Sequence, residues 1–204
     1  MGFTLWFTGL SGAGKSTLSM HVYLEIRRRM LKAELLDGDL IRTNFSSELG
    51  FSREHRDLNV RRIGFISHLL NKNGVNSVVA AIAPFEEARQ QNRTLLDNYV
   101  EIWCKCPLEV VESRDVKGLY ARARAGEIKA FTGITSPYEE PVGADIVCET
   151  DKETVTVSVR NILEWLEDRD FLPKVENCKR RDYSKHDEES WRQRLAELGY
   201  AKQR

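Results

Sequence analysis

Short apolar runs alternate along the chain with longer segments whose apolar residues recur at helical spacing. The short runs predict strands at residues 3–8, 33–36, 78–82, 99–105 and 145–150. Between them, the spacing predicts helices at residues 16–30, 52–73, 86–97 and 153–168, with a further helical segment from Pro107. This alternation predicts an α/β fold with a mostly parallel five-stranded sheet and helices on both faces.

The sequence also contains signals for where individual elements begin and end. Apolar residues four positions apart give the first helix one continuous apolar face: Leu18, Val22, Ile26 and Met30. Ser52 is a suitable N-cap for the second helix, and Gly74 stops it. The run VVAAI, residues 78–82, has no polar residue, as expected of a parallel strand covered on both faces.

Two segments do not fit the alternation of strands and helices. Residues 117–141 form a cation-rich stretch with Gly and Pro that is too long for a simple connection. Residues 172–204 are charged, with KRR at 179–181 and a candidate amphipathic helix at 188–198, and are typical of a docking or interface segment. We therefore expect one domain over residues 1–170, with a special segment at 117–141, and a charged tail over residues 171–204.

Composition narrows the classes of partner. The chain has 204 residues, and its 31 Lys and Arg balance its 31 Asp and Glu, so no overall field attracts nucleic acid or an anionic membrane. It has no run of 18 apolar residues, and its N-terminus passes directly into a predicted strand. We expect a cytoplasmic protein without nucleic-acid or membrane partners. Its four cysteines, which show no C-x-x-C spacing, are expected to be reduced core thiols: Cys104, Cys106, Cys148 and Cys178.

The stretch GLSGAGKST matches the phosphate-binding pattern G-x-x-x-x-G-K-[ST] and lies between a predicted strand and a predicted helix. Its glycines let backbone N–H groups point at phosphate oxygens, Lys15 reaches the β and γ phosphates, and Ser16 offers a hydroxyl to Mg²⁺. The whole loop is predicted to bind ATP: Gly9, Leu10, Ser11, Gly12, Ala13, Gly14, Lys15, Ser16 and Thr17. The chain lacks the N-K-x-D segment of GTPases and is short for a mechanical ATPase, which leaves small kinases.

An acceptor site is expected opposite the phosphate-binding loop. DGDLIR, residues 37–42, ends the second strand, so that Asp39 would face the γ phosphate, orient the attacking hydroxyl and help to hold magnesium waters. The alternative is a solvated turn. Arg56 and Asn59 lie three apart on one helix face, and Arg42 and Arg56 together suit an anionic acceptor, although surface arginines are common.

Four segments together resemble the adenylylsulfate kinase (APS kinase) family of P-loop kinases: GLSGAGKST, DGDLIR, FSREHRDLNVRRI and DVKGLYARARAGEIKAFTGITSPYEEP. The resemblance covers about residues 3–170. It implies transfer of the ATP γ phosphate to the 3′-hydroxyl of adenosine 5′-phosphosulfate, giving 3′-phosphoadenosine 5′-phosphosulfate in sulfate assimilation. The resemblance also implies a homodimer, which is common in the family, and ATP sulfurylase as a candidate partner.

The resemblance also implies roles for individual residues. Lys15 and Asp39 would be catalytic, Ser16 and Asp39 would hold the metal, and Arg124 would contact the nucleotide. Residues matching or lining the acceptor site are Asp39, Arg42, Phe51, Arg56, Asn59, Ile82, Lys117, Ala130 and Phe131. Phe51 and Phe131 are suited to clamp an adenine, with core packing as the alternative. Residues 117–141 would form a lid that excludes water, with a merely solvated basic loop as the alternative.

The chain departs from the family pattern at three positions. Ala83 stands where many members have the serine of I-S-P-[YF], so a phosphoserine intermediate at that position is impossible and direct transfer is expected. His55 replaces an Asp and Ala130 replaces a Gly, for which weaker acceptor binding is expected. These departures keep open the hypothesis of a divergent kinase of another nucleotide-like hydroxyl acceptor. A non-catalytic nucleotide-binding domain is kept as a separate alternative.

Overall fold

The computed structural model describes residues 1–177 and residue 193. Five strands form one sheet in the order β2-β3-β1-β4-β5, and each neighbouring pair is parallel. The strands are β1 (Thr4–Thr8), β2 (Ala33–Asp37), β3 (Asn76–Ala80), β4 (Tyr99–Lys105) and β5 (Ile146–Glu149). The predicted five-stranded parallel sheet is confirmed.

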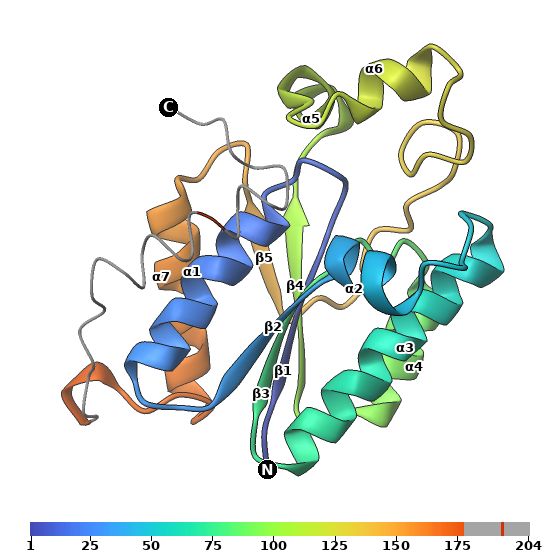
Figure 1. Ribbon diagram of the computed structural model, residues 1–204. Helices are drawn as coiled ribbons and strands as arrows, with labels where there is room; N and C mark the ends of the chain where they lie inside the picture. The colour runs from blue at the N-terminus through green and yellow to red at the C-terminus, as the bar shows by residue number, and fades with distance from the viewer. Residues whose placement is uncertain (178–192, 194–204) are drawn as a thin grey trace.

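Helices cover both faces of this sheet, as Figure 1 shows. One face carries α1 (Lys15–Arg28) and α7 (Val155–Asp168), and the other carries α3 (Arg53–Lys72) and α4 (Glu86–Leu95). Because successive strand side chains point to opposite faces, Leu5 and Phe7 join the core beneath α1 and α7, while Trp6 joins the core beneath α3 and α4. Both faces of β1 are therefore buried, as the apolar run predicts.

Three short helices lie beyond the carboxyl ends of the strands: α2 (Gly38–Phe45), α5 (Leu108–Arg114) and α6 (Leu119–Arg124). In Figure 1 the chain that follows α6 passes close to the N-terminal end of α3. A 3₁₀ turn, η1 (Val175–Asn177), follows the last helix. In parallel α/β sheets, ligands bind at this end of the strands, so the short helices surround the expected site.

Several predicted boundaries are confirmed and others are wrong by a few residues. β4 begins and ends where predicted, and Ser52 caps α3 by accepting a hydrogen bond from His55 N at 3.3 Å. The first helix ends at Arg28, because Met30 takes a left-handed φ of 62° and is exposed. β3 starts two residues early, at Asn76, whose side chain satisfies neighbouring backbone groups by accepting from Phe3 N and donating to Lys32 O.

Neither α2 nor α6 was predicted from the sequence. α2 forms in the DGDLIR segment, for which a solvated turn was the alternative prediction. α6 forms inside the segment 117–141. The predicted tail helix at 188–198 and the basic residues 179–181 lie outside the described residues. Phe171, just beyond α7, packs edge-on against Phe3 at 5.6 Å, and Leu172 is buried in the core.

Two predictions from composition can be compared with the described residues. Cys104, Cys106 and Cys148 are buried free thiols, which confirms the prediction for these three; Cys178 lies outside the described part. Within residues 1–177 and residue 193, no helix has the length and apolar character needed to span a bilayer.

Candidate active site

The phosphate-binding loop connects β1 to α1 through three glycines with positive φ: Gly9 at 143°, Gly12 at 76° and Gly14 at 90°. A Cβ atom at Gly9 would lie 2.5 Å from the Cys104 carbonyl oxygen, so no larger residue fits there. Among the described residues, no side chain caps α1 at Gly14. The first N–H groups of α1, together with its positive dipole end, are therefore available to bind an anion.

Lys15 and Ser16 begin α1 and are both buried. Lys15 Nζ donates to the carbonyl oxygens of Gly9 at 3.0 Å and Leu10 at 2.7 Å, which folds the lysine back over the loop. Burial lowers the pKa of Lys15 to about 8. A phosphate chain in the loop would restore the charge of this ammonium group, because an adjacent anion favours the protonated form.

Asp37, which the sequence analysis did not single out, is the carboxylate next to Ser16. Ser16 Oγ donates to Asp37 Oδ2 at 3.1 Å, while Asp37 Oδ1 caps α2 by accepting from Asp39 N at 2.9 Å and Leu40 N at 3.4 Å. Burial raises the pKa of Asp37. The helix-capping role of Asp37 explains why the turn after β2 becomes a helix, and the signal was visible as an Asp before Gly-Asp-Leu-Ile.

Asp39 lies further out, in the first turn of α2, and faces the lid. Its Oδ2 is 2.7 Å from Lys117 Nζ, and 72% of its side chain is exposed compared with 23% for Lys117. The predicted catalytic carboxylate therefore points across the site toward a cation from the segment 117–141. Ser16, predicted to share a metal with Asp39, is hydrogen-bonded to Asp37 instead.

A cavity of about 230 Å³ lies beside the phosphate-binding loop. Its lining includes Ser11, Thr17 and Lys15 from the loop and α1, Lys117 and Tyr120 from the lid, and Thr150 after β5. Among the described residues, the arginine that lines it is Arg114, whose Nη2 donates to Thr150 O at 2.8 Å. This residue was missed, because nothing in its local sequence distinguishes it from other arginines at helix ends.

Arg124, the lid arginine predicted to contact the nucleotide, lies elsewhere. It forms two hydrogen bonds with the Glu112 carboxylate, at 2.8 and 2.9 Å, and is not among the residues that line the cavity in the described structure. Its side chain is mostly exposed. A contact between Arg124 and the nucleotide would require the pair with Glu112 to separate.

The predicted acceptor residues gather around Phe51, between α2 and α3. The Arg42 guanidinium lies 4.4 Å from the Phe51 ring centroid and that of Arg56 lies 5.7 Å from it. Phe51 is 56% exposed, so core packing is excluded for this ring. Burial lowers the pKa of Arg42, and burial followed by the charge of Arg42 lowers the pKa of Arg56. Two neighbouring cations with reduced hydration favour an anionic ligand.

Arg56 also connects α3 to the lid. Its Nε donates to Phe51 O at 2.9 Å, and its two terminal nitrogens donate to the Thr132 hydroxyl and to the Ala130 carbonyl. Ala130 has a φ of 53°, the left-handed conformation that glycine adopts without strain. An alanine therefore stands here in a conformation that favours glycine, and the hydrogen bond from Arg56 to its carbonyl helps to hold it there.

Phe131, in the segment 117–141, is partly buried. Its ring packs edge-on against Tyr120, with centroids 5.0 Å apart, and it contacts the core beneath α1 and α7. Tyr120, which was also missed, donates its hydroxyl hydrogen to Ser11 O at 2.8 Å. Tyr120 thus connects the phosphate-binding loop to the predicted acceptor ring, a link that only the folded chain reveals.

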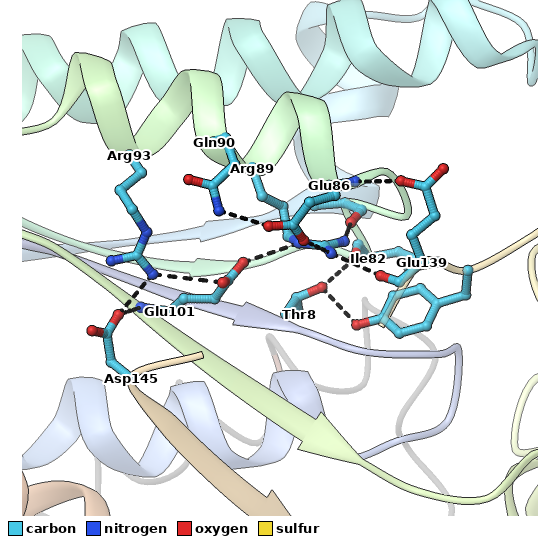
Figure 2. Close-up of polar contacts among 11 residues, drawn as sticks. Thr8, Ile82, Glu86, Arg89, Gln90, Arg93, Glu101, Glu139 and Asp145 are labelled. Carbon is cyan, nitrogen blue, oxygen red and sulfur yellow. Dashed lines mark hydrogen bonds and ion pairs between the residues drawn. The ribbon is translucent and has the colours of Figure 1, made fainter. Parts of the chain in front are cut away.

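The remaining predicted positions are on the wall formed by β3 and α3. Asn59 Oδ1 is buried with no hydrogen-bond partner among the described residues, so it is ready to accept from a ligand. The Ile82 carbonyl accepts a hydrogen bond from Thr8 Oγ1 (Figure 2). His55 Nδ1 accepts from Gly50 N at 2.8 Å, so this histidine organises the loop before α3.

Comparisons with known proteins show which family the chain belongs to. The family model described as adenylylsulphate kinase matches residues 1–149. An adenylyl-sulfate kinase from Rippkaea orientalis is 50% identical over 173 residues, which are 85% of this chain and 96% of that protein. The chain belongs to the adenylyl-sulfate kinase family. As a member of this family it is a kinase, and the predicted enzyme class is confirmed.

Solved structures support the same assignment. The Mycobacterium tuberculosis APS kinase CysC, in complex with AMPPNP and APS, is 39% identical, with a TM-score of 0.78 over 81% of this chain and 98% of that one. A sugar kinase from Janibacter sp. HTCC2649 is 17% identical, with a TM-score of 0.59 over 82% of this chain and 95% of that one, and supports the fold alone. This adenylyl-sulfate kinase therefore has the predicted P-loop kinase fold.

Proposed function

We propose that this adenylyl-sulfate kinase transfers the γ-phosphoryl group of ATP to the 3′-hydroxyl of adenosine 5′-phosphosulfate. One observation carries the proposal: Asp39 and Lys117 meet at 2.7 Å between the phosphate-binding loop on one side and the Arg42, Phe51 and Arg56 cluster on the other. The solved relative that binds AMPPNP and APS supports both ligands. The product is 3′-phosphoadenosine 5′-phosphosulfate.

On the donor side, the loop and Lys15 bind the triphosphate of ATP. Ser16 and Asp37 supply a hydroxyl and a carboxylate oxygen 3.1 Å apart, and oxygen ligands of this kind fit Mg²⁺. In the described residues, no three His, Cys, Asp or Glu side chains gather as a metal cluster, so phosphate oxygens and water would complete the coordination. The ion would neutralise charge on the β and γ phosphates.

On the acceptor side, Arg42 and Arg56 bind the phosphosulfate group with their guanidinium forks. The exposed face of Phe51 stacks on the adenine and Phe131 approaches from the lid, each ring contact contributing about 1 kcal/mol. Asn59 offers its buried amide oxygen to a donor on the acceptor. The clamp depends on closure of residues 117–141 over the nucleotide.

At the junction, Asp39 accepts a hydrogen bond from the 3′-hydroxyl and orients it toward the γ phosphorus. Lys117, its partner across the site, moves its charge toward the transferring phosphoryl group. Ala83 provides no side-chain nucleophile, so the phosphoryl group passes directly from ATP to the acceptor, which requires alignment instead of a covalent intermediate.

The test is acceptor-dependent ADP release with Mg²⁺ present. We expect adenosine 5′-phosphosulfate at micromolar concentration to stimulate release, with AMP as the matched nucleotide that lacks the sulfate, and chromatography to identify the 3′-phosphorylated product. No stimulation, with tight binding of both nucleotides by calorimetry, would instead indicate a non-catalytic binding domain. Stimulation by another hydroxyl compound alone would indicate a divergent kinase.

Homodimerisation, association with ATP sulfurylase and cytoplasmic localisation stay predictions.

A further inference from the structure

Arg89, on α4, is one of the largest fully buried side chains of the protein and has no part in the site described above. Figure 2 shows its guanidinium group at the centre of a polar network that includes Glu86, Glu101 and Glu139. The group contacts four separate segments: Glu86 on its own helix, Glu101 on β4, Ala83 after β3, and Glu139 at the end of the lid segment. A side chain that costs this much to desolvate needs a reason to be buried.

Two of these contacts are to backbone carbonyls that lie far apart in the sequence, one after β3 and one at the end of the segment 117–141. Arg89 Nη1 donates to Ala83 O and Nη2 donates to Glu139 O, both at 2.7 Å. Ala83 has a φ of 44°, and a non-glycine residue persists in this conformation only when its surroundings hold it there. Arg89 supplies one such restraint, and the same group ties the lid end to the restrained residue.

Further hydrogen bonds reinforce the same junction, which we term the lid anchor and define as residues 82–86 with residues 138–139. Glu139 Oε2 accepts from Glu86 N at 2.7 Å, and Glu139 N donates to Pro84 O at 2.8 Å. Tyr138 Oη lies 3.0 Å from Thr8 Oγ1, at the end of β1 (Figure 2). The carboxyl end of the lid is therefore fixed to the rim of the sheet.

The charge of Arg89 is balanced inside the protein. Its Nε lies 3.1 Å from Glu101 Oε1, and Glu101 Oε2 lies 3.6 Å from Arg93 Nη2, which also binds Asp145 at 2.9 Å. Buried ion pairs of this kind add little net stability compared with apolar packing. An apolar side chain in place of Arg89 would pack as well but would lose the directional hydrogen bonds to the two carbonyls.

We propose that Arg89 is a positioning residue for phosphoryl transfer: it fixes the carboxyl end of the lid against Ala83, so that Phe131 and Lys117 close on the acceptor in register. The inference rests on the proposed function and deepens it. The other end of the lid is held separately, because Tyr120 donates its hydroxyl hydrogen to Ser11 O of the phosphate-binding loop at 2.8 Å. The Asp115 carboxylate accepts from Tyr120 N and Ala121 N at 3.0 Å and orders the first turn of α6. Loss of the anchor should thus disturb acceptor binding more than ATP binding.

Arg89→Lys tests the inference, because lysine keeps the charge that Glu101 requires but cannot reach both carbonyls. We expect the KM for adenosine 5′-phosphosulfate to rise about 10-fold or more and kcat to fall, with the KM for ATP changing less than about 2-fold. Arg93→Lys is the matched control, because Arg93 shares the helix and the Glu101 contact but does not reach the anchor. It should leave both KM values within about 2-fold.

An unchanged acceptor KM and kcat in Arg89→Lys, with only a lower Tm, would overturn the inference. If this variant fails to fold, Tyr138→Phe removes a single anchoring hydroxyl, and wild-type acceptor kinetics in it would equally contradict the proposal. Trypsin cleavage within residues 117–141 provides a readout independent of activity. Cleavage should be faster in Arg89→Lys than in Arg93→Lys, and equal rates would count against the anchor. This expectation holds even if the wild-type enzyme phosphorylates another acceptor.

Discussion

Lys117 Nζ lies 2.7 Å from Asp39 Oδ2, so the first lysine of the lid forms an ion pair with the carboxylate that follows β2. The Asp39 side chain is 72% exposed, and a pair as exposed as this contributes only about 0–1 kcal/mol to stability. It can therefore separate readily when ligands enter. The pair brings together two residues that the family resemblance assigns to the acceptor site.

Replacing Asp39 tests its role at the reacting hydroxyl. Asp39→Asn keeps the size of the side chain but removes the negative charge that orients and accepts from the 3′-hydroxyl. We expect kcat to fall by about 100-fold or more while the Tm changes little, because the side chain is exposed. Steady-state ADP release and thermal unfolding measure the two effects.

Asp168→Asn is the matched control, since Asp168 is an exposed carboxylate at the end of α7, on the far side of the sheet from α3. It should retain wild-type kinetics. Wild-type kcat in Asp39→Asn would remove Asp39 from the mechanism and leave Asp37 as the carboxylate nearest to the metal position.

ATP binding is predicted to take up a proton near pH 8. Burial lowers the Lys15 pKa from 10.5 to about 8 in the ligand-free protein, whereas the phosphates of ATP raise it again. At pH 8 about half of the molecules must gain a proton on binding, and at pH 7 about one tenth. The affinity for ATP should consequently fall as the pH rises above 8.

Calorimetry in two buffers of different ionisation enthalpy measures this proton uptake. Lys15→Arg is the control, because arginine does not deprotonate in this range and the variant should show no uptake from this position. Equal proton uptake in the two proteins would mean that another group titrates, and that the buried lysine is charged before ATP arrives.

The sequence predicted the sheet and its principal helices well, because buried parallel strands and amphipathic helices leave clear patterns. β4 was predicted to the residue, and the α3 N-cap at Ser52 was correct. The short helices α2 and α6 escaped, since each depends on one carboxylate that accepts from backbone N–H groups, Asp37 in α2 and Asp115 in α6. Such local caps outweigh the weak apolar pattern of a helix of only six to eight residues.

Site residues placed by local sequence could likewise be predicted, whereas those placed by contacts distant in the chain could not. Lys15 lies where its motif requires, because the loop and its neighbours in sequence determine its position. Arg114 and Tyr120 line the donor cavity through contacts with Thr150 and Ser11, partners distant in the chain. Their roles depend on tertiary distances that a single sequence does not contain.

Gly64 is predicted to be essential for the packing of α3 on α4. A Cβ atom there would lie 2.1 Å from Asn92 Oδ1 and 2.7 Å from its Cγ, and Asn92 is only 1% exposed. An alanine ordinarily favours a helix over glycine by about 1 kcal/mol, but overpacking costs about 1–3 kcal/mol, so Gly64→Ala should lower the free energy of unfolding.

Chemical denaturation measures this change, with Gly143→Ala as the control. Among the described residues no atom lies within 4 Å of a Cβ at Gly143, so that variant should change stability by less than about 0.5 kcal/mol. Activity per folded molecule should be unchanged in both. A more stable Gly64→Ala protein would show that Asn92 can turn away and that the helix contact is adaptable.

Direct transfer makes a final prediction at Ala83. This residue is 1% exposed and carries a φ of 44°, with its carbonyl held by Arg89. Ala83→Ser adds a hydroxyl without removing any contact that aligns ATP with the acceptor, so kcat should change less than about 3-fold. With radiolabelled ATP, neither wild-type protein nor the variant should retain acid-stable phosphate during turnover. Stoichiometric labelling of the wild-type chain would require a nucleophile elsewhere and would replace the in-line mechanism by a two-step one. A large gain in kcat for Ala83→Ser would show that serine chemistry had been lost at this position.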